Sequence, residues 1–237
     1  MLHKSVRVRT SAGGFVVTVG KRIFLLMALL RAIALGIASN PLACIVVVCM
    51  FWVGVAGGVA TAGPLNDAAR EGDAGKVAEL LAQGADVNDR DESRETPLIA
   101  AALAAEPEVA VVLIEAKADI EARNDRGFTA LHAAAYSGSL AIAKLLLDHG
   151  AEVDASSMHK ITPLHVAAEE NRTAIAELLL ARGAQVEAMQ EYGYTPLSRA
   201  TFYQSTDVMV LLKKHGAKCQ SQKTMGASYK VCIAVGN

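Results

Sequence analysis

Two histidines and two cysteines have the residue types and spacing that could support chemistry. His132 and His165 occupy the same place in two similar local sequences, TALHAA and TPLHVA, and two such imidazoles could serve as ligands of one metal ion. Cys219 and Cys232 lie near the C-terminus without a Cys-x-x-Cys pair nearby, so a zinc site is not expected there. What these side chains do depends on the elements that position them.

No other pattern in the sequence indicates catalysis. The chain has no glycine-rich phosphate loop and no nucleophile elbow. Acidic pairs such as Glu169-Glu170 fall in a helical pattern and are expected to be solvated on the helix surface. We therefore predict no catalytic residue and no cofactor.

The two histidines belong to a unit that repeats along the chain. Thr96, Thr129, Thr162 and Thr195 are evenly spaced, and one further step of the same length back reaches Gly63. The segments that begin at these five positions are GPLNDAA, TPLIAAA, TALHAAA, TPLHVAA and TPLSRAT. Five units in register without an insertion predict a repeating array instead of a single globular core.

Each unit predicts two short helices and a projecting loop. The threonine is a favourable N-cap, and proline follows at the first helical position in four of the five units. A second helix carries an apolar stripe, as in LAIAKLLL, and ends at a glycine such as Gly150 or Gly183. A turn such as Gly84-Ala85-Asp86-Val87-Asn88 then leads into a loop, the finger, that reaches the next unit.

These motifs resemble the ankyrin repeat. The TPLHVA segment at 162–167 is close to that family's TPLHxA signature, and the LLLxxGAxVxA ending occurs at 145–155 and 178–188. The apolar runs near the N-terminus predict a preceding N-terminal apolar helix, and the resemblance implies an all-α solenoid of about five helix-turn-helix repeats with β-turn fingers. Its units, repeats one to five, would span residues 63–95, 96–128, 129–161, 162–194 and 195–220, within an array over 63–220 that is followed by a tail at 221–237.

The resemblance also implies roles for individual residues. His132 and His165 would bond neighbouring backbone and fix the turn, so we predict no metal site. Partners of ankyrin arrays meet the finger tips and the exposed side of the first helices, which together form a concave face. Aromatic side chains are favoured at such interfaces. The candidate partner-binding residues are therefore Asp125, Arg126, Phe128, Tyr136, His159, Ile161, Glu191, Tyr192, Tyr194, Phe202 and Tyr203.

The N-terminal part of the chain has a different character from the array. Residues 1–41 are basic and contain a first apolar stretch, and residues 42–60 form an uncharged run that is long enough to span a bilayer. Residues 42–62 are either the apolar core of an export signal cleaved after Ala62 or an uncleaved membrane helix. The start codon could be Met1 or Met27. We expect export to the periplasm or the exterior, and the alternative is a single-pass membrane protein with its repeats on the extracytoplasmic side.

Charge separates the two parts as well. Residues 1–62 hold six basic and no acidic residue, whereas the remainder holds 17 basic and 24 acidic residues. An acidic body argues against nucleic acid as a partner. In an exported protein, Cys219 and Cys232 are expected to form a disulfide that pins the tail against the last repeat.

The sequence therefore predicts a monomeric, non-catalytic module that binds a partner protein through the concave face of a bacterial-type ankyrin array. One alternative is a membrane-anchored scaffold that tethers a partner, with membrane contact only through residues 42–60. Another is an enzyme or metalloprotein whose site is hidden in the array. The absence of any insertion between the units argues against the last of these.

Overall fold

A computed structural model describes residues 63–235 of the protein. The expected signal or membrane segment within 1–62 lies outside the described residues, as does the choice of start codon. No helix in the described range has the length and apolar character needed to cross a bilayer.

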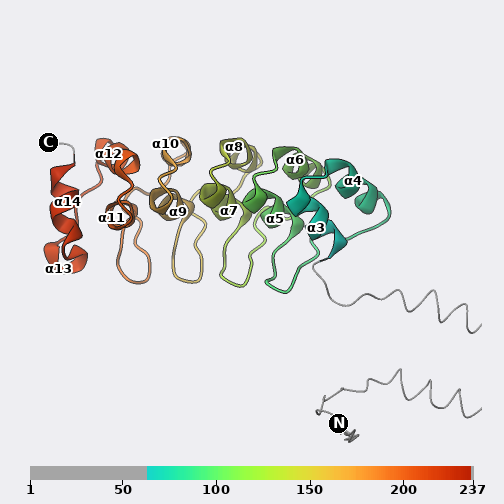
Figure 1. Ribbon diagram of the computed structural model, residues 1–237, viewed down its shortest axis with the longest axis horizontal. Helices are drawn as coiled ribbons and strands as arrows, with labels where there is room; N and C mark the ends of the chain where they lie inside the picture. Colours follow the sequence, from blue (N-terminus) through green and yellow to red (C-terminus); the bar gives the residue numbers. More distant parts are fainter. Residues whose placement is uncertain (1–62, 236–237) are drawn as a thin grey trace, which may run out of the picture. The chain divides into compact units, whose positions relative to one another are not determined.

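The described residues form twelve helices and no strand, and they confirm the predicted all-α solenoid. The helices of the array form two rows, and long loops project on the side of one row (Figure 1). The row next to these loops, the inner row, consists of α3 (Pro64–Glu71), α5 (Pro97–Ala104), α7 (Ala130–Ser137), α9 (Pro163–Glu169) and α11 (Pro196–Phe202). The outer row consists of α4 (Ala74–Ala82), α6 (Pro107–Glu115), α8 (Leu140–Asp148), α10 (Thr173–Ala181) and α12 (Thr206–Lys214).

The inner helices begin where the repeated threonines lie. Thr96 is the N-cap of α5, and its hydroxyl accepts a hydrogen bond from the backbone N–H of Ile99. Thr129 and Thr162 cap α7 and α9 in the same way, with a histidine three residues later completing a capping box. These caps satisfy N–H groups that the first helical turn leaves without a partner, so each unit begins its helix at the same place.

Leucines and alanines fill the space between the rows. The leucine two residues after each repeat's first residue is at most 2% exposed in all five repeats. Burying one such side chain contributes roughly 1.5–3 kcal/mol. Small side chains such as Ala134, Ala135, Ala167 and Ala168 are fully buried, which lets neighbouring inner helices approach closely. No repeat buries its apolar surface alone, so the array is stable only as a stack.

The fingers are joined from one repeat to the next by a recurring hydrogen bond. In each case a side-chain oxygen accepts from a backbone N–H that lies 31 residues later in the sequence. The acceptors are Asn88, Glu121, Asp154 and Glu187, and the donors are Asp119, Glu152, Gln185 and Lys218. The acidic or amide residue in every finger therefore fixes the register of neighbouring fingers.

One finger position has a left-handed backbone whichever residue occupies it. Gly127 (φ 77°) and Gly193 (φ 78°) stand there in repeats two and four, and Arg94 (φ 57°) and Lys160 (φ 56°) in repeats one and three. The conformation of the finger thus persists in the two units that lack glycine, at a cost of about 1–2 kcal/mol for a residue with a side chain.

The C-terminal segment after the last repeat, expected only as a tail, is helical. It contains α13 (Gln222–Met225) and α14 (Ser228–Ala234), and α14 lies beside α11 at the end of the array (Figure 1). Cys219 and Cys232 form a disulfide with 5.9 Å between their Cα atoms, and Cys232 is fully buried. The segment therefore covers the apolar end of the last repeat.

Candidate protein-binding surface

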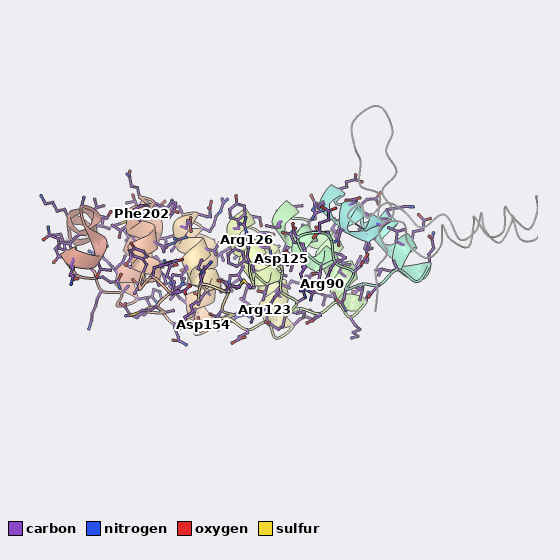
Figure 2. The ribbon with its side chains drawn as sticks, turned by 90° about the horizontal axis from the view of Figure 1, so that it is seen from below. Arg90, Arg123, Asp125, Arg126, Asp154 and Phe202 are labelled. Carbon is purple, nitrogen blue, oxygen red and sulfur yellow. A yellow bond between two sulfur atoms is a disulfide. The ribbon has the colours of Figure 1, made fainter. Side chains whose placement is uncertain are left out.

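The fingers and the exposed sides of the inner helices form one continuous surface, which we call the inner face. Figure 2 views the molecule from the side of the fingers, with Asp125 and Arg126 over its middle and Phe202 toward its C-terminal end. A row of side chains runs along the inner helices at one shared position, near the end of each helix. Its members are Arg70, Leu103, Tyr136, Glu169 and Phe202.

Over repeats two and three the inner face is hollowed into a groove of about 520 Å³, which we call the central groove. Its floor includes Ile99, Leu103 and Tyr136, and its finger side includes Phe128 and Arg126. Tyr136 is 55% exposed and Leu103 is 37% exposed, so apolar surface remains open to water here. Asp125 also lines the groove, so four of the candidate residues meet in it.

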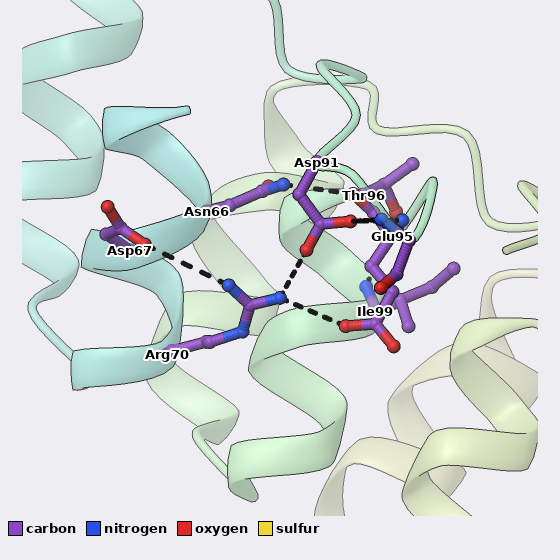
Figure 3. Close-up of polar contacts among 8 residues, drawn as sticks. Asn66, Asp67, Arg70, Asp91, Glu95, Thr96 and Ile99 are labelled. Atoms are coloured by element: carbon purple, nitrogen blue, oxygen red, sulfur yellow. Dashed lines mark hydrogen bonds and ion pairs between the residues drawn. The ribbon is translucent and has the colours of Figure 1, made fainter. Parts of the chain in front are cut away.

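An ion-pair cluster occupies the inner face beside the groove on the side of repeat one (Figure 3). Arg70 pairs with Asp91 and, at 3.0 Å, with Glu95, and these hydrogen bonds keep the pKa of Arg70 above its ordinary value. Asn66 donates from its side-chain amide to the Glu95 carbonyl at 2.9 Å, which ties α3 to the finger. Arg70 also lies 3.9 Å from a carboxylate oxygen of Asp67, so it faces three carboxylates and this end of the groove carries a surplus of negative charge.

A second ion pair lies on the inner face beyond the groove, on the side of repeat four. Arg199 on α11 pairs with Glu169 on α9, and each side chain is 21% exposed. The guanidinium carbon of Arg199 lies 5.2 Å from the centre of the Tyr203 ring, a cation–π geometry. The hydrogen bond to Glu169 raises the pKa of the Tyr203 hydroxyl above its ordinary value.

The remaining aromatic candidates, except Tyr194, whose backbone carbonyl contacts His165, form two further groups. At the finger tips, His159 Nδ1 lies 2.7 Å from a carboxylate oxygen of Glu191, and its ring centre lies 5.9 Å from that of Tyr192. At the C-terminal end of α11, the rings of Phe202 and its C-cap residue Tyr203 meet edge to face at 5.4 Å. The candidate residues therefore do not form one patch but a central groove and two aromatic groups toward the C-terminal end.

The two repeated histidines are structural parts of the inner row. His132 Nδ1 accepts from the Thr129 N–H at 3.2 Å, and its Nε2 lies 2.9 Å from the carbonyl oxygen of Ile161. His165 makes the same pair of contacts, to the Thr162 N–H at 3.2 Å and to the Tyr194 carbonyl at 3.1 Å. Both nitrogens of each ring are thus used within the array, which is the turn-fixing role that the resemblance implied. Burial lowers the pKa of each ring to about 4.

Two candidate residues contribute differently from the exposed aromatics. The Ile161 side chain is half-buried against the core, and its backbone carbonyl holds His132. Phe128 is half-buried and stacks on His132 with 5.0 Å between ring centres. Sequence reasoning omitted Leu103, which lies in the groove, although it holds the position that Tyr136 fills in the next repeat and could have been identified from that register.

Within residues 63–235 no group of three or more histidine, cysteine, aspartate or glutamate side chains is arranged to hold a metal ion. The arrangement in this range is one of open apolar surface between charged fingers. It suits non-covalent association with another macromolecule.

Stacked helix pairs with aligned fingers define a helical repeat protein. A family model described as ankyrin repeats (3 copies) matches residues 65–157 and 154–223, which together make up more than half of the chain. The chain belongs to the ankyrin-repeat family, and its array is a protein–protein interaction module of a family that is typically non-catalytic. No curated protein matches the chain.

Proposed function

We propose that this protein binds a partner protein non-covalently through its inner face and does no catalysis itself. One observation carries the proposal: Tyr136, Tyr192 and Phe202 are 55%, 68% and 69% exposed on the same face. Large aromatic side chains at this level of exposure are favoured anchors of protein interfaces. The partner would gain affinity by covering them.

The proposed location of the array is outside the cytoplasm, with the protein acting as a monomer. Support comes from the uncharged run at 42–60 and the A-x-A pattern that ends at Ala62. The bond between Cys219 and Cys232 adds support because disulfides persist mainly in oxidising compartments. In the membrane-anchored alternative, the same run remains in the bilayer and the array tethers its partner there.

N-terminal sequencing of the protein from fractionated native cells separates these two locations. Export with cleavage predicts a new N-terminus at Gly63 in a soluble extracytoplasmic fraction. An intact N-terminus that stays with membranes after a high-salt wash would favour the anchor.

A quantitative pull-down tests the binding surface itself. The variant Tyr192→Ala/Tyr194→Ala/Phe202→Ala removes three exposed rings from the inner face. We expect it to recover at least one partner less efficiently than the wild type. The matched control is Leu140→Ala/Val210→Ala, which removes exposed apolar side chains from the outer row and should leave recovery unchanged. Equal recovery of every partner by both folded variants would contradict the proposal.

A further inference from the structure

We infer that the central groove binds a short segment of the partner that presents a bulky apolar side chain next to a carboxylate, with the carboxylate at Arg126. The inference rests on the proposed function, because it specifies which chemistry the inner face would recognise. It concerns repeats two and three only, and it assigns the aromatic groups near Tyr192 and Phe202 to other contacts.

The two ion pairs of the inner face set the length of the segment. Arg70 and Glu169 occupy the same row as Leu103 and Tyr136, one repeat before and one repeat after them. Each is already paired, Arg70 with Asp91 and Glu95 and Glu169 with Arg199. A partner would have to break an ion pair to bind at Arg70 or Glu169. The part of the inner face that is open to binding therefore covers α5 and α7.

The apolar floor of this stretch favours an apolar side chain of the partner. Leu103 and Tyr136 lie on the neighbouring helices α5 and α7, and the buried Ile99 of α5 also lines the groove. Val166 on α9 completes the groove toward repeat four. A leucine, isoleucine or phenylalanine laid here would remove apolar surface from water on both sides of the contact.

The charge of the groove favours a carboxylate at one point. Three charged residues line it, and two of them are compensated: Glu95 by Arg70 at 3.0 Å and Asp125 by Arg94 at 3.8 Å. Arg126 is exposed and has no ion-pair partner within the described residues. Arg126 is therefore the cation of the groove that remains available to a partner.

The neighbouring basic residues do not compete for this role. Arg90 donates to the carbonyl of Arg123 at 2.8 Å, and Arg123 donates to the carbonyl of Ser156, so both guanidinium groups are bound to adjacent fingers. The overall negative charge of the array has little influence at this range, because exposed charges more than about 8 Å apart are largely screened at physiological salt. The surplus of carboxylates around Arg70 would repel a uniformly acidic segment. A single carboxylate at Arg126 avoids that repulsion and fixes the direction of the segment.

The experiment is a selection of displayed random short peptides on the full 237-residue chain, carried out in parallel on four proteins. These are the wild type, Arg126→Glu, the charge-conserving Arg126→Lys, and Lys144→Glu as a matched charge reversal on the exposed side of α8. We expect the wild type, Arg126→Lys and Lys144→Glu to enrich peptides with leucine, isoleucine or phenylalanine beside aspartate or glutamate. Arg126→Glu should enrich lysine or arginine at that place.

A peptide selected on the wild type then gives affinities. We expect Arg126→Glu to weaken its binding about two- to fivefold, as for an exposed charge pair, and Tyr136→Ala to weaken it about tenfold. Lys144→Glu should leave the affinity unchanged. The unfolding temperature of Tyr136→Ala, compared with that of the wild type, shows whether the weaker binding comes from the missing side chain alone or from a less stable fold.

The outcomes separate this inference from the proposed function. Selection of the same sequences by Arg126→Glu and the wild type would overturn the inference. So would binding that depends on Tyr192 or Phe202 but not on Tyr136, although the proposed function would stand. Failure of the wild type to enrich any peptide over a scrambled pool would also overturn the inference, whereas the proposed function is tested separately by the pull-down.

Discussion

His132 and His165 make the stability of the array depend on pH. Each ring must be neutral to accept the N–H of its threonine while its other nitrogen donates to the carbonyl of the next finger. Burial lowers the pKa of each to about 4 from the ordinary value of 6.5. The unfolded chain therefore takes up these two protons at a higher pH than the folded chain does.

We predict that the array loses stability between pH 7 and pH 4. The histidine contribution is fully present above the unfolded pKa and is lost as the pH falls from 6.5 toward 4. At pH 5 the loss would be about 2 kcal/mol for each ring. Urea unfolding midpoints measured at pH 7.5 and at pH 5 would show it.

The control for this prediction is His132→Asn/His165→Asn, because Asn66 fills the corresponding place in repeat one and donates to the carbonyl of Glu95. The variant should be less stable at neutral pH but less sensitive to acid. An equal shift of the midpoint in wild type and variant would show that other groups cause the pH dependence.

A second prediction at the residue scale concerns the left-handed finger position. Lys160 is exposed and has a φ of 56°, so Lys160→Gly should relieve backbone strain. The gain is reduced by the greater freedom of glycine in the unfolded chain, which leaves about 0.5–1 kcal/mol and a small rise in melting temperature.

Gly193→Ala is the matched opposite change. Gly193 occupies the same position in repeat four, and an added Cβ there would meet no atom within 4 Å, so only the backbone conformation matters. Gly193→Ala should therefore lower the melting temperature. A clear fall for Lys160→Gly as well would mean that the lysine stabilises the finger by another route.

At the scale of elements, the C-terminal helices depend on the disulfide. Gln220 donates from its side-chain amide to the Gly193 carbonyl at 2.6 Å, and the Lys213 amine donates to the Val235 carbonyl, but α13 and α14 are short. Closing a loop of this length stabilises the fold by about 3 kcal/mol in chain-entropy estimates.

We predict that Cys219→Ser/Cys232→Ala loosens the end of the array without unfolding its middle. Amide hydrogen exchange should become faster in α13, α14 and α11, while α5 and α7 keep their protection, because each repeat contacts only its neighbours. A reducing agent should reproduce the effect in the wild type and add nothing in the variant. Unchanged hydrogen exchange in α14 would show that packing alone holds α13 and α14 in place, without the disulfide.

The helices of the array could be predicted from sequence because each depends on local signals. A threonine cap, a following proline and a terminal glycine recur at a constant interval, and the structure begins its inner helices directly after Gly63, Thr96 and their equivalents. Helices α13 and α14 have no such repeated counterpart. Periodicity therefore could not reveal them.

Only part of the inner face could be predicted from the sequence. The register identifies which residues of the inner helices are exposed, and it correctly places Tyr136 and Phe202 on that face. The pairs Arg70–Asp91 and Glu169–Arg199 join residues 21 and 30 positions apart. Whether such side chains meet depends on the rotamers and on the spacing of repeats, so the division of the surface into a groove and two aromatic groups required the structure.

At the scale of the whole molecule, residues 63–235 present two surfaces of different character. The inner face combines exposed aromatic rings with charged fingers, and the outer row exposes isolated aliphatic side chains such as Val111, Leu140 and Val210. Scattered apolar residues of that kind are ordinary on protein surfaces, whereas grouped aromatic residues mark interfaces. We therefore propose that partner binding takes place on the inner face of the array.

Site-specific photocrosslinking in native cells tests that assignment most directly. A photoreactive amino acid would replace Tyr136 or Tyr192 on the inner face, or Val111 or Leu140 on the outer row, one site at a time. We expect the inner-face sites to capture a common partner protein and the outer-row sites not to capture it. Capture of that partner from the outer row, with none from positions 136 and 192, would contradict the proposal.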